Sequence, residues 1–134
     1  MKSLNNETLI INHRTQLIIK SKALLSLKDY MTDFDISNVL VVLDSYIKIN
    51  KSKFNYVLKS LEFIDNKKFV VCSSFEPSFY DLEKIKSQVK IKPSLIISIG
   101  GGSIIDIGKA LSAGLLYKGH LSDLQGQDKF RFKT

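Results

Sequence analysis

The feature that most constrains this chain is an apolar run that leads directly into three consecutive glycines. Four of the six residues of Ser94–Ile99 are apolar, and Gly100, Gly101 and Gly102 follow this segment without a spacer. From Ser103 to about Leu116, the spacing of apolar residues predicts a helix. A strand, a glycine turn and a helix in this order indicate a βα unit of a parallel sheet, with the turn at the carboxyl end of the strand.

Two further strand–helix units precede this one. Val39–Leu43 is continuously apolar and closed by Asp44, a pattern typical of a parallel strand buried on both faces. The periodicity then predicts a helix, a strand and a helix, over Phe54–Phe63, Lys68–Cys72 and Phe79–Val89. We therefore expect an α/β fold, a Rossmann-like doubly wound parallel sheet. Its strands at 39–43, 69–72 and 94–99 should be parallel and buried, the last of them inside the sheet rather than at its edge.

The first part of the chain predicts a small β-hairpin. Thr8–Ile11 and Gln16–Ile19 have strand character, and Asn12–Arg14 can form the turn between them. We expect this N-terminal β-hairpin at the edge of the sheet. Ala23 to about Thr32 has helical spacing.

Size and composition indicate one soluble domain over residues 1–134. The chain is 44% apolar and 25% charged, and it has no apolar run long enough for a membrane helix. No signal-peptide core is present at the N-terminus, so we expect a cytoplasmic protein without a membrane partner. Cys72, the single cysteine, lies in an apolar run and is expected to be a buried thiol.

The net charge of +7 does not by itself predict nucleic-acid binding. The lysines are scattered, and the arginines, which suit bidentate contacts to phosphates and bases, are only Arg14 and Arg131. We expect a solvated lysine-rich surface and no nucleic-acid partner.

The glycine turn is suited to an anionic ligand. Gly100, Gly101 and Gly102 allow positive φ angles and let backbone N–H groups approach a phosphate at the N-terminus of the following helix. Ser103 can cap that helix or donate to a phosphate oxygen. Tight strand-to-helix packing is the alternative, but one glycine would suffice for it. Asp106 can form an ion pair with Lys109 or reach the ligand, and spacing alone leaves both open.

The motif Gly-Gly-Gly-Ser-x-x-Asp-x-x-Lys after an apolar strand resembles that of the iron-containing (group III) alcohol dehydrogenases. This family shares a superfamily with glycerol dehydrogenase and dehydroquinate synthase, and the resemblance covers about residues 16–127. It implies that Gly100, Gly101, Gly102 and Ser103 bind the pyrophosphate of a dinucleotide. It places Asp106 close to the nicotinamide.

Asp44, at the end of the run Val41–Leu43, resembles the family's aspartate that binds the adenosine ribose. Its carboxylate would repel a 2′-phosphate, so NAD is expected in preference to NADP. The alternative is that Asp44 only caps the next segment.

Some positions depart from the family pattern. Lys20–Lys22 replace the usual glycines, and Glu76-Pro77 stands where Asn-Pro is common. Together with Asp123–Gly126, this Glu-Pro resembles the branch of 3-deoxy-octulosonate 8-oxidases.

The family continues into a helical domain in which an aspartate and three histidines hold iron or zinc. This chain has only His13 and His120, without ligand spacing. We therefore expect that it holds no metal and does not oxidise alcohols alone. An alcohol or sugar substrate would bind only with the absent half, and a complementing fragment or a second copy of the chain is an expected partner. An apolar patch beside the glycine turn should favour self-association. A dehydroquinate synthase-type lyase and a non-catalytic interaction module are alternatives; dinucleotide binding would argue against the second.

Overall fold

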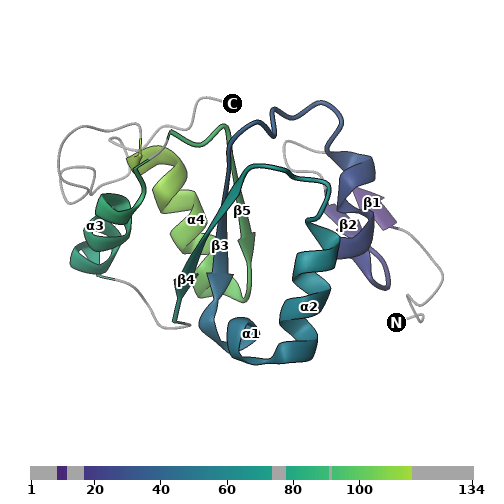
Figure 1. Cartoon of the computed structure of the whole chain (residues 1–134), viewed down its shortest axis with the longest axis horizontal. Helices are drawn as coiled ribbons and strands as arrows, with labels where there is room; N and C mark the ends of the chain where they lie inside the picture. The colour runs from purple at the N-terminus through teal and green to yellow at the C-terminus, as the bar shows by residue number, and fades with distance from the viewer. Residues whose placement is uncertain (1–8, 12–16, 74–77, 91, 116–134) are drawn as a thin grey trace.

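The computed structural model describes residues 9–11, 17–73, 78–90 and 92–115. Within them, three parallel strands form one sheet with helices on both of its faces (Figure 1). The central strand β3 (Val39–Asp44) lies between β4 (Lys67–Cys72) and β5 (Leu95–Ile99). The expected α/β fold with a doubly wound parallel sheet is thus confirmed.

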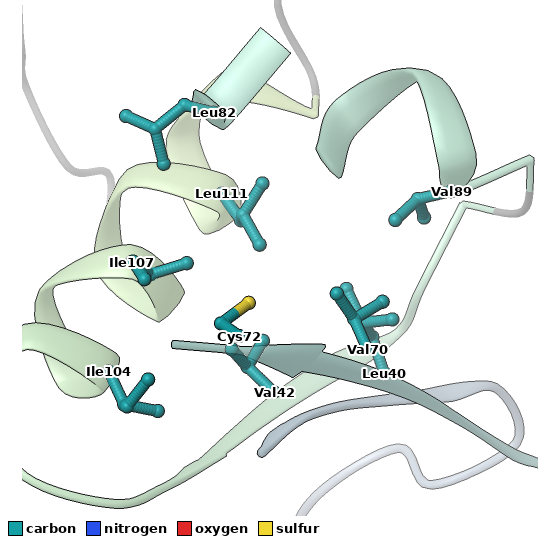
Figure 2. Packing of buried hydrophobic residues seen from close by; sticks show 9 residues of the cluster. All are labelled: Leu40, Val42, Val70, Cys72, Leu82, Val89, Ile104, Ile107 and Leu111. Carbon is teal, nitrogen blue, oxygen red and sulfur yellow. The ribbon is translucent and has the colours of Figure 1, made fainter. Parts of the chain in front are cut away.

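The central strand contributes side chains to two separate hydrophobic cores. Every residue of Val39–Leu43 is 0% exposed, and successive side chains of a strand point to opposite faces. Leu40 and Val42 pack beneath α3 (Phe79–Gln88) and α4 (Gly102–Gly114), as Figure 2 shows. Val39, Val41 and Leu43 pack on the other face, beneath α2 (Lys51–Ser60) and the residues that follow it.

The predicted place of Leu95–Ile99 inside the sheet is wrong. β5 pairs with β3 on one side, and among the described residues no strand pairs with its other side. All five of its residues are half-buried, whereas those of β3 are fully buried. Two apolar runs of similar length cannot be ranked by apolarity alone, because the crossover connections decide which one acquires partners on both sides.

Two helical segments differ from their predicted bounds. Residues 45–49, for which no element was predicted, form α1 (Ser45–Ile49). The helix predicted over 54–63 is α2, which starts earlier because the Asn50 side chain accepts a hydrogen bond from the Lys53 amide at 3.0 Å. This N-cap satisfies one of the free amides of the first turn.

The N-terminal hairpin is confirmed, but it is not an edge of the parallel sheet. β1 (Leu9–Ile11) pairs with β2 (Leu17–Ile19) in a separate antiparallel sheet. The segment after it, Ala23–Tyr30, is a 3-10 helix rather than an α-helix. Residues three apart align in a 3-10 helix, which places Leu24 and Leu27 together against the α2 side of the sheet.

Helix α4 lies very close to β5, and Gly108 makes this approach possible. A Cβ at Gly108 would overlap the Ser98 hydroxyl oxygen and lie 3.1 Å from the Ser98 Cβ. Gly108 is buried between Ile107 and Leu111, both in the core of this face. No local pattern in the sequence predicts a role for Gly108, and only the packing of the helix on the strand reveals one.

We predict that Gly108→Ala lowers the free energy of unfolding by about 1–3 kcal/mol, the usual cost of overpacking a core, despite the better helix propensity of alanine. Adding Ser98→Ala to the same chain removes the overlapping oxygen and should restore most of the loss. Urea unfolding of the two single variants and the double variant measures this coupling. A double variant no more stable than Gly108→Ala would contradict the assigned contact.

Candidate functional site

The carboxyl end of β3 is formed by Asp44, which is 8% exposed. Its Oδ1 accepts a hydrogen bond from the Tyr46 amide at 3.0 Å and thereby caps α1. The capping role considered for Asp44 is therefore confirmed. It leaves the carboxylate at the rim of the sheet, where its negative charge acts on whatever binds there.

Gly100 directly follows the carboxyl end of β5, and only glycine fits this position. Its φ of +157° lies in a region that L-residues rarely adopt. A Cβ here would stand 2.7 Å from Ile104 Cγ1 and 3.0 Å from Asp44 Cβ. Gly100 and Asp44, which lie far apart in the sequence, are therefore in direct contact in the fold.

Gly101 and Gly102 have no such packing reason to be glycine. A Cβ at either position would meet no atom within 4 Å, and both residues are exposed. Their lack of side chains leaves the space in front of the turn open, where a ligand can contact the backbone. The packing alternative therefore explains the first glycine of the turn and not the other two.

The N-terminus of α4 carries no side-chain cap. Gly101 is the N-cap residue, and its carbonyl accepts hydrogen bonds from the amides of Ile104 and Ile105, both at 3.1 Å. Of the two roles left open for Ser103, the capping role does not apply, because this residue already lies within the helix, where it is half-buried. The first amides of a helix need partners from outside it, so this end of α4 is suited to an anion.

Asp106 lies one turn further along α4 and is exposed, as is Lys109. Within the described part of the chain, no ion pair joins the two side chains. An ion pair with Lys109 therefore does not explain Asp106, and the contact of Asp106 with the ligand stays a prediction.

The two strand ends meet at the topological switch point of the sheet. β3 and β5 are neighbours, but α1 and α2 follow β3 on one face, whereas α4 follows β5 on the other (Figure 1). Divergent helices after adjacent parallel strands leave a crevice between their amino ends. Open α/β sheets bind ligands in this crevice.

A hollow of about 220 Å³ lies at the neighbouring strand end, between β4 and α3. Its lining includes Cys72, Ser73, Asp81 and Lys84. Cys72 pairs in register with Asp44, so the hollow, Asp44 and the glycine turn follow one another across the carboxyl edge of the sheet in the strand order β4-β3-β5.

The Cys72 thiol is a packed core group, as expected. It is 7% exposed and lies among apolar side chains of β3, β4 and α4 (Figure 2). Burial raises its pKa, and the negative charge of Asp44 adds to the shift. A thiol with a raised pKa is a poor nucleophile near neutral pH.

Among the described residues, no group of three or more His, Cys, Asp or Glu side chains is placed to hold a metal ion. The two histidines, His13 and His120, lie outside the described residues, as do the departures noted at Glu76-Pro77 and Asp123–Gly126. In the same part of the chain, no helix combines the length and apolarity needed to cross a membrane.

The sheet order, the helices on both faces and the glycine turn at the switch point define a Rossmann-like α/β domain. A model of the iron-containing alcohol dehydrogenase family matches residues 14–134. The chain therefore belongs to the iron-containing alcohol dehydrogenase family, in agreement with the resemblance of its glycine motif.

Among solved structures, the chain is similar to the NADH-dependent butanol dehydrogenase A of Thermotoga maritima, with a TM-score of 0.66 and 22% identity. This likeness concerns the fold. The match covers 90% of this chain and 30% of that dehydrogenase. A search of curated proteins finds no match.

We predict that alanine destabilises the chain much more at Gly100 than at the neighbouring Gly101. Gly100→Ala should lower the free energy of unfolding by about 2 kcal/mol or more, because its Cβ collides with Ile104 and Asp44. Gly101→Ala introduces no collision and should cost no more than about 1 kcal/mol, the difference between glycine and alanine as an N-cap residue. Urea denaturation of both variants tests the distinction, and equal losses at the two positions would refute it.

We also predict that ionisation of the Cys72 thiol makes the free energy of unfolding depend on pH. The folded pKa of this thiol is raised above its usual value of 9.0, so the unfolded chain ionises first as the pH rises. Its contribution is fully present below that value and is lost as the pH increases toward the folded pKa. Cys72→Ala should flatten the fall of the unfolding free energy in this window, as measured by urea titration at a series of pH values. Identical slopes in both proteins would contradict the buried thiol.

Proposed function

We propose that this chain binds NAD as the cofactor-binding part of an oxidoreductase. The reaction would be hydride transfer between an alcohol or sugar hydroxyl and the nicotinamide. One observation carries the proposal: Asp44 and the glycine turn meet at the switch point, where Gly101 and Gly102 leave the backbone open. The matched family consists of alcohol dehydrogenases, which gives the reaction class.

The proposed pose follows the strand order. The pyrophosphate lies at the glycine turn and accepts hydrogen bonds from the first amides of α4 and from Ser103. The adenosine ribose lies over Asp44, whose carboxylate accepts its hydroxyl hydrogens. The adenine then points toward the hollow between β4 and α3. Neighbouring strands are about 4.8 Å apart, so the three subsites are spaced as successive groups of one adenosine diphosphate.

The nicotinamide end extends past the turn, toward Asp106 on the exposed face of α4. NAD supplies the hydride acceptor. In this proposal the metal that would activate the alcohol is held by the helical part of the family's enzymes rather than by the described residues, among which no side-chain cluster is placed to hold one. We expect no alcohol-dependent formation of NADH by this chain alone and no substrate specificity residing in it.

Exposed apolar side chains near the glycine turn are suited to contact with a second domain. Ile105, in the first turn of α4, is 43% exposed. Val71 at the end of β4 and Tyr80 at the start of α3 are 44% and 77% exposed. We propose that a complementing fragment or a second copy covers this edge.

Calorimetric titration with NAD is expected to show weak binding, because the chain forms only one wall of the cleft. Gly102→Leu should abolish it by filling the space in front of the turn. Ser112→Leu adds the same side chain at an exposed position further along α4 and should leave binding unchanged. If the wild-type chain binds no dinucleotide at millimolar concentration, the proposal fails.

Asp44→Asn retains an oxygen that can cap α1 and removes the charge that repels a 2′-phosphate. We expect it to narrow the preference for NAD over NADP by about tenfold, or ~1.4 kcal/mol. Asp33→Asn, at an exposed turn remote from the carboxyl edge, is the matched charge control. A wild-type chain that prefers NADP would overturn the role given to Asp44.

A further inference from the structure

The first part of the segment that joins β3 to β4 carries positive charges only. Residues 45–61 contain four lysines and no aspartate or glutamate. Lys48, Lys51 and Lys53 are exposed, and so are two apolar residues close to them in the chain, Tyr46 at 66% and Ile49 at 79% exposure. We call these five residues the α1–α2 corner; it lies at the carboxyl end of β3 (Figure 1).

Two of these lysines oppose the stability of the helix that carries them. Lys51 and Lys53 lie in the first turn of α2, where no acidic residue is present. The N-terminus of a helix is its positive end, so cations there are repelled and anions are favoured. Helix α3 follows the usual rule, with Asp81 in its first turn in a reciprocal capping box with Ser78. Lysines at the N-terminus of a helix, where they destabilise it, indicate a function other than folding.

Two of the three lysine side chains lie near aromatic rings. Lys48 Nζ lies 3.9 Å from the centroid of the Phe54 ring, and Lys53 Nζ lies 5.8 Å from that of Tyr46. A ring orders the ammonium group without neutralising it. The corner thus presents oriented positive charges next to protruding apolar groups.

We propose that the α1–α2 corner docks an acidic protein segment that also carries a large apolar side chain. The glutamate or aspartate carboxylates pair with the lysines, and the apolar side chain contacts Tyr46 and Ile49. Isolated large apolar residues inside a polar rim are typical of protein interfaces. The corner has no arginine, the residue that best recognises phosphates, and α1 has five residues, too few to lie along a membrane surface.

The test uses the full chain without dinucleotide, so its result does not depend on the cofactor proposal. The probe is a fluorescein-labelled peptide, EELEEFEE, followed by fluorescence anisotropy. The charge variant is Lys51→Glu with Lys53→Glu. The control, Lys90→Glu with Lys92→Glu, changes the net charge equally at exposed positions near the amino end of β5. Acids in the first turn of α2 are favourable, so the charge variant should melt no lower than the wild type.

We expect the charge variant to lose at least about tenfold in affinity for the peptide, whereas the control pair stays within about twofold. Affinity should fall with added salt, and EEQEEQEE should bind more weakly than EELEEFEE. Ile49→Ser should weaken EELEEFEE binding and leave EEQEEQEE unaffected. Equal losses in both variant pairs would overturn the proposal, because they would indicate only net charge. Tighter binding of duplex DNA or of phosphatidylserine vesicles than of the peptide would overturn it as well.

Discussion

The complete enclosure of β3 is the constraint on which the rest of the structure depends. Its five apolar residues are shielded on both faces and paired on both sides, so helices must cover both faces of the sheet. The chain must also cross over β3 between β4 and β5. These requirements bring the ends of β3 and β5 together and send the helices that follow them to opposite faces. The crevice at this switch point is a consequence of burying one strand completely.

The glycines of this region divide into two kinds. Gly100 and Gly108 are fixed by packing, since a Cβ at either would collide with a neighbouring element. Gly101 and Gly102 face open space, so the fold does not explain them. Asp44 combines both kinds of role, because it caps α1 through one oxygen and places a negative charge beside the turn. Residues that packing does not require are the ones on which the proposed dinucleotide site rests.

The unexplained features of the chain gather at the carboxyl edge of the sheet. The open glycines, the uncapped end of α4, the hollow beside Cys72 and the lysines at the start of α2 all lie there. At the first turn of α2, charge is arranged against the preference of the helix. Departures from local stability rules of this kind are expected at functional surfaces. Membership of the iron-containing alcohol dehydrogenase family agrees with the proposal that a dinucleotide binds at this edge.

The sequence by itself determined the alternation of strands and helices, the hairpin and the glycine turn, because apolar periodicity and glycine placement are local signals. It also determined the family, through the motif from Gly100 to Lys109. Only the tertiary structure decided that β3 rather than β5 is central, that Leu24 and Leu27 lie on a 3-10 helix, and that Gly108 admits Ser98. The tertiary structure also decided that Asp44 and Gly100 lie against each other. These outcomes depend on which distant segments pair and pack, and no local pattern in the chain records that choice.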